Sequence, residues 1–336
     1  VSIRIVYRNG TVTGRNVAVN VTRDRAVMLV RGVSRTADGF SLMETVVGNA
    51  AGIAAVEIAG RRYALGPAGR LAFALPTAVG GASAQTPRVN MRVIYDNGLD
   101  AETWVTPARV AGGLIPLPRR PRRMALVIGN GRYGRGIDGE ATANADAGLV
   151  GDMFRQRFGF EQRVLADASK SRLVATLRRL GRELGRNDQL VVHYAGRSIT
   201  DRKNGRSYWL ASDARAASAA NWVSTDAVYR MLQEMGLRGA MVFSDAAFSV
   251  GRSNRTLRVA GRQAVRTPVQ VVASGFGRPV RAVPDDAHSA FTWRLASTLS
   301  SIGADVQATN LFDVIRERLT RPRPTPPRRT AALANP

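Results

Sequence analysis

The segment Met124-Ala-Leu-Val-Ile-Gly-Asn130 decides how the second half of this chain folds. It is a continuous apolar run that ends in glycine and asparagine, and it follows directly on an arginine- and proline-rich stretch. A run of this kind is typical of a strand that is buried on both faces of a sheet. Such strands belong to parallel sheets with helices on both sides, so the segment predicts an α/β architecture from residue 124 onward.

From this strand to about residue 320, strand patterns alternate with helix patterns. Strands are predicted at 124–128, 163–165, 190–194, 208–210, 240–243 and 269–273. Helices are predicted at 143–158, 171–184, 224–235, 290–300 and 310–319. Ser224-Thr-Asp226 provides polar side chains that can cap the start of one of these helices. This alternation requires a mostly parallel sheet with helices on both faces.

Residues 1–115 have the pattern of an all-β, sandwich-like domain. Strands are predicted at 1–7, 16–22, 26–30, 54–58 and 71–74, with a short turn near Leu42–Val47. The segment Val1–Gly10 is echoed by Val89–Gly98, with five identical positions, and both end in the hairpin signal Asn-Gly. Three explanations stay open: equivalent hairpins of a sandwich, duplicated units, or a chance likeness between strand–turn segments.

Two stretches rich in proline and arginine flank the α/β region. Residues 116–123 hold three prolines, which exclude a helix or an inner strand, and four arginines, which favour a solvated linker. Residues 321–336 have low complexity and are expected to be disordered or polyproline-like unless a partner orders them. The predicted organisation is therefore 1–115, 116–123, 124–320 and 321–336.

Composition excludes several classes of function. The 336 residues, 45% of them apolar, can form two globular domains, and no run approaches the length of a membrane span. Because the chain has no cysteine, it forms no disulfide, no thiolate zinc site and no cysteine nucleophile. His193 and His288 are the only histidines. We therefore expect neither a metal nor a cofactor.

The net charge of +24 is the most unusual property of the composition. Among the 49 basic residues only Lys170 and Lys203 are lysines. The charge favours attraction to polyanions, but the arginines are spread along the whole chain and aromatic residues make up only 6%. A basic surface is thus favoured over dedicated nucleic-acid binding. We expect protein partners, bound through the β-domain and the tail.

The start of the given sequence bears on the cellular location of the protein. The chain begins at Val1 in a strand pattern and without an initiator methionine, as after removal of a signal peptide or after trimming. An exported or periplasmic location is thereby favoured over a cytoplasmic one.

A glycine motif follows the first buried strand. Gly129-Asn-Gly131-Arg-Tyr-Gly134 matches the dinucleotide-binding pattern, in which a helix begins within the glycine turn. Here Gly136, Asp138 and Gly139 stand between the motif and the predicted helix. Nucleotide binding is therefore a minor alternative.

Further short motifs follow one another in a fixed order along the α/β region. They are Met124–Asn130 with Tyr133, Asn144–Ala147, Phe158–Phe160, Asp188–Gly196, Tyr208–Ala214, Val242–Ser249, Val272–Ser274 and Ala290–Thr292. Their order and content resemble the caspase and metacaspase family domain of bacterial proteins. The resemblance implies a caspase-like α/β/α sandwich over residues 124–320.

The resemblance also locates the positions of the family's catalytic residues. In the family, a histidine at the end of one strand polarises a cysteine at the end of its neighbour, and the thiolate attacks the peptide carbonyl. The chain has Arg197 at the histidine position and Ala247 at the cysteine position, and Ser198 and Val250 replace glycines of the two motifs. A guanidinium stays protonated, and a methyl group is not a nucleophile. The sequence therefore predicts an inactive pseudo-protease that serves as a binding or structural subunit.

Several polar residues are predicted to remain around the former substrate pocket. Asp245 matches the acidic position that forms the family's pocket for basic residues, although it could equally cap a loop or pair with Arg197. Asp213, Ser198 and Ser249 complete the predicted pocket. The arginine-rich segment 251–266 matches the family's processing loop or is simply a solvated loop.

Two other functions stay open as alternatives. The first is a basic polyanion- or nucleic-acid-binding protein that uses its arginines. The second is a hydrolase in which Ser198, Ser244 or Ser249 acts as nucleophile with His193 as base. A single histidine in an apolar strand is more commonly a core residue, so the second alternative is the weaker one.

Overall fold

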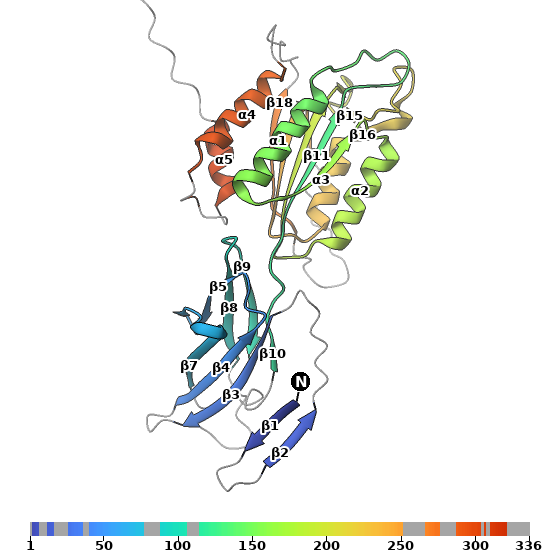
Figure 1. The fold of residues 1–336 in the computed structure, drawn as a ribbon. Helices are drawn as coiled ribbons and strands as arrows, with labels where there is room; N and C mark the ends of the chain where they lie inside the picture. The colour runs from blue at the N-terminus through green and yellow to red at the C-terminus, as the bar shows by residue number, and fades with distance from the viewer. Residues whose placement is uncertain are drawn as a thin grey trace, which may run out of the picture. The chain divides into compact units, whose positions relative to one another are not determined.

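The computed structural model describes residues 2–6, 12–16, 26–35, 40–76, 88–105, 114–250, 266–275, 287–303, 306 and 310–320. The chain divides into two compact units, Val1–Pro121 and Arg122–Pro336 (Figure 1). Each unit has a hydrophobic core of its own, as expected of a domain. None of the helices within these ranges is long and apolar enough to cross a membrane.

The first unit consists of antiparallel β-structure. A hairpin pairs β1 (Ser2–Val6) with β2 (Val12–Asn16). One four-stranded sheet has the order β10 (Leu114–Pro116), β3 (Val27–Arg35), β4 (Phe40–Gly48) and β7 (Arg70–Pro76). The other has the order β6 (Arg61–Tyr63), β5 (Ile53–Ile58), β8 (Val89–Tyr95) and β9 (Asp100–Val105). A short 3-10 helix, Pro67–Gly69, leads into β7.

Both four-stranded sheets contribute to one core. The cluster contains Met28 and Phe73 from the first sheet and Val56 and Met91 from the second, all almost fully buried. Side chains along β8 alternate between buried and half-buried, as in a strand with one face on the core. The predicted all-β character of this region is confirmed.

The structure corrects two details of this region. Leu42–Val47 belongs to β4 and does not form a turn, because Met43, Thr45 and Val47 are buried at the alternate positions of a strand. β2, at Val12–Asn16, lies before the strand predicted at 16–22 and was not predicted; residues 17–25 lie outside the described residues, so the rest of that predicted strand is not tested. The two echoed segments each form the first strand of an antiparallel hairpin, β1–β2 and β8–β9.

The second unit is built on a five-stranded parallel sheet (Figure 1). Its order is β12 (Glu161–Ala166), β11 (Arg123–Asn130), β13 (Gln189–Gly196), β17 (Gly239–Ala247) and β18 (Val269–Gly275). A small antiparallel sheet joins β14 (Ser198–Thr200), β15 (Ser207–Leu210) and β16 (Trp222–Ser224). The helices are α1 (Ala143–Phe158), α2 (Lys170–Glu183), α3 (Thr225–Glu234), α4 (Ala290–Ser301) and α5 (Leu311–Thr320).

Helices cover both faces of the parallel sheet. The core on one face combines sheet residues with side chains from α2 and α3, such as Leu177 and Leu232. The core on the other face includes Phe154 of α1, Leu299 of α4 and Ile315 of α5. The predicted α/β/α sandwich with a parallel sheet is thus confirmed.

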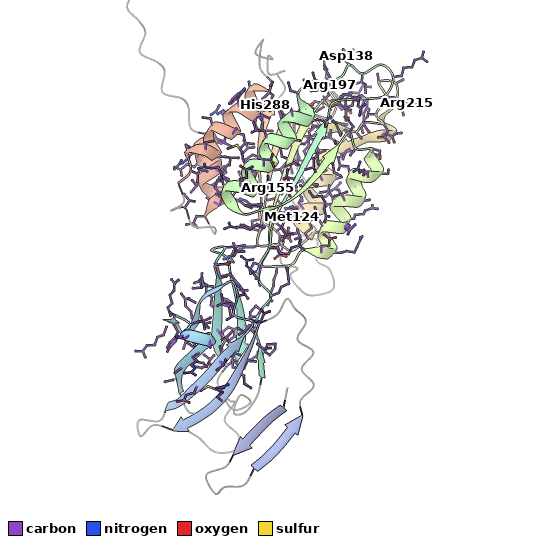
Figure 2. All side chains as sticks on the ribbon, in the orientation of Figure 1. Met124, Asp138, Arg155, Arg197, Arg215 and His288 are labelled. Carbon is purple, nitrogen blue, oxygen red and sulfur yellow. The ribbon has the colours of Figure 1, made fainter. Side chains whose placement is uncertain are left out.

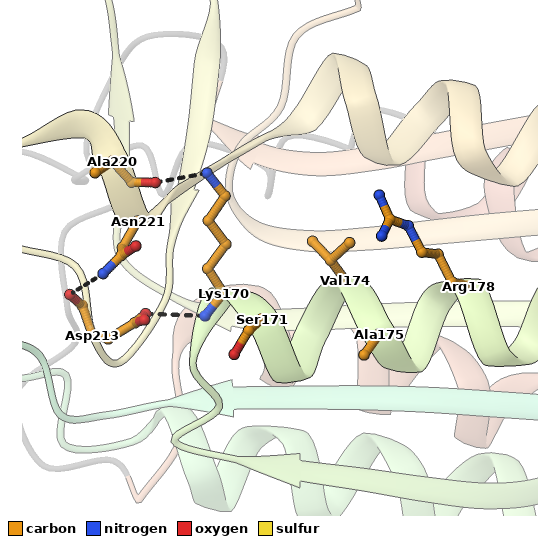
Figure 3. A pocket seen from close by; sticks show the side chains of 8 residues that line it. All are labelled: Lys170, Ser171, Val174, Ala175, Arg178, Asp213, Ala220 and Asn221. Carbon is orange, nitrogen blue, oxygen red and sulfur yellow. Dashed lines mark hydrogen bonds between the residues drawn. The ribbon is translucent and has the colours of Figure 1, made fainter.

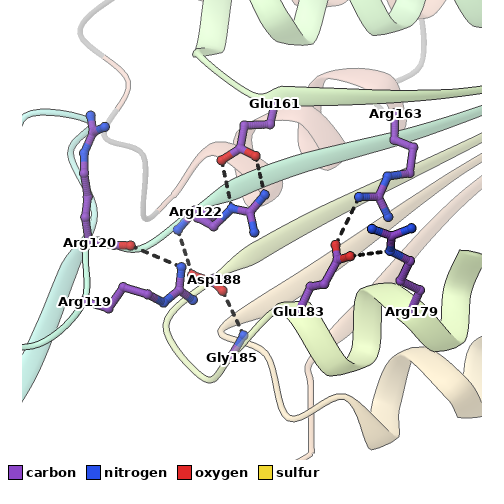
Figure 4. Close-up of polar contacts among 9 residues, drawn as sticks. All are labelled: Arg119, Arg120, Arg122, Glu161, Arg163, Arg179, Glu183, Gly185 and Asp188. Atoms are coloured by element: carbon purple, nitrogen blue, oxygen red, sulfur yellow. Dashed lines mark hydrogen bonds and ion pairs between the residues drawn. The ribbon is translucent and has the colours of Figure 1, made fainter. Parts of the chain in front are cut away.

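Hydrogen bonds join the N-terminal ends of three strands to the loop after α2 (Figure 4). The buried Asp188 accepts the backbone N–H of Arg122 at 2.7 Å and that of Gly185 at 2.8 Å. The Arg122 guanidinium binds Glu161 of β12 through two hydrogen bonds. Within residues 116–123, Arg122 is thus bound to the sheet, and Leu117 is only 2% exposed.

The glycines after β11 permit close packing of the chain against itself. A Cβ atom at Gly129 would lie 2.6 Å from the carbonyl oxygen of Ala143, at the start of α1. A Cβ at Gly131 would lie 2.8 Å from the Glu140 carbonyl oxygen. Backbone therefore lies against both glycines, and α1 begins only at Ala143, outside the glycine turn. The glycine motif is therefore explained without a nucleotide.

Candidate functional site

The predicted catalytic positions lie at the ends of two adjacent strands. β13 and β17 are parallel neighbours, and Ala195 of β13 is paired with Asp245 of β17. Arg197 directly follows β13, and Ala247 ends β17. The Ser198 hydroxyl accepts the backbone N–H of Ala247 at 3.0 Å. The two segments are therefore side by side at the C-terminal edge of the sheet, the end opposite Met124 (Figure 2).

Arg197 holds the loop that connects β11 to α1. Its Nε and Nη2 donate to the carbonyl oxygen of Gly139 at 3.3 and 3.0 Å, and its Nε lies 3.9 Å from the Glu140 carboxylate. Its backbone N–H donates to the Tyr133 hydroxyl at 2.7 Å. Burial raises the pKa of Tyr133 to about 12, so this hydroxyl stays protonated. The expected ion pair between Arg197 and Asp245 is wrong, because the guanidinium is directed to residues 139 and 140.

Asp245 belongs to a second polar group, which surrounds the start of α4. Burial raises the pKa of its carboxyl to about 6, while hydrogen bonds with Ser289 and Ser274 lower it and the Asp146 charge raises it. Asp146, only 1% exposed in the first turn of α1, accepts from the Ser289 N–H at 3.1 Å and lies 2.9 Å from Nδ1 of His288. Two carboxyl groups from different elements thus share the N-terminal cap of α4.

The segment after β17 is fixed by a hydroxyl network. Ser249 Oγ accepts the backbone N–H of Ser207 at 2.7 Å. The buried Thr225 hydroxyl accepts the Ser249 N–H at 3.2 Å and lies 2.8 Å from the Ser249 carbonyl oxygen. No pattern in the sequence places Thr225 or Ser207 in this region. The Ser-Thr-Asp cap indicated that a helix begins there, but not that the threonine is directed inward.

Asp213 lies apart from the other predicted pocket residues. Its carboxylate accepts the backbone N–H of Lys170 at 3.0 Å, at the first residue of α2 (Figure 3). The cavity that it lines includes none of Asp245, Ser198 and Ser249. The arginine-rich segment and the tail cannot be placed, because residues 251–265 and 321–336 lie outside the described residues.

His193 is a fully buried residue of β13. Within the described part of the chain, neither of its ring nitrogens has a hydrogen-bond partner. The nearby serine hydroxyls have other partners, since Ser244 accepts from Trp209 Nε1 at 2.9 Å and Ser249 accepts from Ser207. A displaced serine–histidine site would need a hydrogen bond between nucleophile and base. Among the described residues, no serine hydroxyl forms a hydrogen bond with the His193 ring.

We expect His193→Leu to raise the free energy of unfolding more at acidic pH than at alkaline pH. Burial lowers the pKa of folded His193 to about 3, whereas an unfolded histidine titrates near 6.5. Below about pH 6.5 the unfolded state therefore binds the proton first, and stability falls by about 1.4 kcal/mol per pH unit. The gain should be about 2 kcal/mol larger at pH 5 than at pH 8 in urea titrations. An equal increase in the free energy of unfolding at both pH values would contradict the lowered pKa of folded His193.

Comparisons with known proteins identify a family model and a solved structure to which this chain is similar. A family model described as the caspase domain matches residues 122–331, which is more than half of the chain. Among solved structures, protein GSU0716 from Geobacter sulfurreducens is 16% identical, with a TM-score of 0.43. That match covers 62% of this chain and 90% of the other. No curated protein has a sequence that matches this one.

Proposed function

The chain belongs to the caspase domain family, and from this premise we propose that it is a catalytically inactive member that acts as a binding or structural subunit of a larger assembly. One observation supports the proposal most directly. Arg197 and Ala247 stand at the ends of two adjacent parallel strands, where the family resemblance expects histidine and cysteine.

Neither residue can perform the chemistry of a cysteine peptidase. The alanine methyl group has no lone pair with which to attack a carbonyl, and the chain contains no cysteine that could replace it. The Arg197 guanidinium remains charged at any working pH and already donates to the Gly139 carbonyl oxygen. No shift of pKa could repair either loss.

The hydrogen bond between Ser198 and Ala247 supports the proposal independently. In acyl transfer, backbone N–H groups stabilise the developing oxyanion, and the N–H of the nucleophile residue is commonly one of them. Here the N–H of Ala247 donates to the Ser198 hydroxyl. A substrate carbonyl would have to compete with this internal acceptor.

The former pocket is also occupied by the chain itself. Asp245 and Asp146 are the acidic groups that could receive a basic side chain of a substrate. Both already interact with Ser289, and Asp146 also contacts His288. A basic ligand would have to displace these contacts, so we place the partner surface elsewhere on the molecule. Trp104 and Trp293, each at least half exposed, are of a residue type enriched in protein interfaces.

Peptide cleavage assays test the proposal. We expect no hydrolysis above the buffer rate for reporters ending in arginine, lysine or aspartate, because nucleophile and base are both missing. Ser249→Ala and His193→Ala should leave this background unchanged. Hydrolysis by the wild-type chain that either substitution removes would show instead a hydrolase with displaced residues.

A further inference from the structure

A cavity of about 430 Å³ lies along α2, on the part of the molecule that includes Asp213 (Figure 3). Val174 and Ala175 of the helix form an apolar part of its lining, and Lys170 and Arg178 stand one turn to either side of Val174. The Lys170 ammonium donates to the Ala220 carbonyl oxygen at 2.7 Å, which holds the lysine at one end of the cavity. The cavity thus combines an apolar part with cations on both sides.

The cations continue along the same face of the helix. Lys170, Val174, Arg178 and Arg182 are spaced by four residues and therefore form one row. Arg179 pairs with Glu183 at 2.6 Å, and Glu183 is the helix's only acidic residue. Arg178 and Arg182 are exposed and have no acidic partner within the described residues. Arg178, which lines the cavity, and Arg182, one turn farther along the same row, are thus available to carboxylates from outside.

We propose that this α2 groove, formed by Lys170, Val174, Ala175, Arg178 and Arg182, docks an acidic segment of a partner protein. An apolar side chain of the segment packs on Val174 and Ala175, and flanking carboxylates pair with the two arginines. A second copy of the chain does not fit, because its net charge of +24 is repelled. The apolar lining favours a peptide over a nucleic acid, whose phosphates need only cations.

This inference extends the proposed binding role but does not depend on whether the chain cleaves peptides. Fluorescence anisotropy of the full-length chain tests it with two labelled peptides of equal negative charge, one with a central leucine and one with serine there. We expect the leucine peptide to bind about tenfold more tightly, because only leucine buries apolar surface in the groove. Val174→Ser should remove this preference.

Two double variants that lose the same charge distinguish binding at the α2 groove from non-specific attraction of the acidic peptide to a basic protein. Arg178→Ser/Arg182→Ser should weaken binding of the leucine peptide by about tenfold or more. Arg155→Ser/Arg316→Ser is the control, on α1 and α5, where both side chains are 53% exposed. It should change binding by less than about threefold, since exposed charges away from a site are largely screened.

Three results would overturn the proposal. If both double variants weaken binding of the leucine peptide equally, net charge alone explains the binding. An oligonucleotide of the same charge that competes as well as the leucine peptide would assign the surface to polyanions. Absence of binding by the leucine peptide would exclude the site. Because the substituted arginines are exposed and Val174 is half-buried at the surface of α2, circular dichroism should show unchanged folding.

Discussion

Replacing Ser198 with glycine in an Arg197→His/Ala247→Cys background is expected to raise the cleavage of an arginine reporter by about 100-fold. Under the proposed function the two substitutions supply a base and a thiol, but the N–H at position 247 still donates to the Ser198 hydroxyl. Glycine removes that acceptor and frees the N–H for the oxyanion. One such donor contributes about 100- to 1,000-fold to catalysis where it has been removed by mutation.

Measurement of kcat/KM shows whether the increase comes from loss of the Ser198 hydroxyl or from the greater backbone freedom of glycine. Ser198→Ala in the same background removes the hydroxyl but keeps a Cβ atom, so it should give most of the same increase. If only glycine raises the rate, backbone freedom and not the hydroxyl is responsible. A double variant that is already as fast as the triple variant, or a triple variant with no activity, would contradict the role given to Ser198.

Asp146→Ala is expected to lower the free energy of unfolding of the second unit by about 3 kcal/mol. The carboxylate is almost fully buried and joins α1 to the start of α4 through the Ser289 N–H and the His288 ring. Its removal leaves the Ser289 N–H without this acceptor and opens a small void between the two helices. Urea unfolding followed by circular dichroism measures the loss.

Asp152→Ala is the matched control on the same helix. Asp152 is 52% exposed, and its one ion pair among the described residues is with Arg155, three residues along, so its loss should cost less than about 0.5 kcal/mol. Equal losses for the two variants would show that the Asp146 contacts do not stabilise the junction between α1 and α4.

Local sequence patterns were sufficient to predict most of the second unit. The apolar runs at Met124–Ile128 and Leu190–Tyr194 exclude exposed strands, and α1 occupies the predicted residues 143–158. The adjacency of the segments that carry Arg197 and Ala247 was implied by the family resemblance, which places the two positions at the ends of neighbouring strands. The small strands β14 and β16 were missed because three residues carry too little periodicity.

Only the tertiary structure decided which groups each polar side chain contacts. Arg197 binds the Gly139 carbonyl oxygen and not Asp245, because the loop before α1 reaches the guanidinium. The contact between His288 and Asp146 joins residues 142 positions apart. A local pattern reports which face of an element is buried. It does not report which distant groups are brought within hydrogen-bond reach, since that depends on how the whole chain packs. The sequence thus determined the succession of strands and helices along the second unit and the presence of Arg197 and Ala247 at the positions that the resemblance compares with catalytic residues. Packing determined which groups these residues contact.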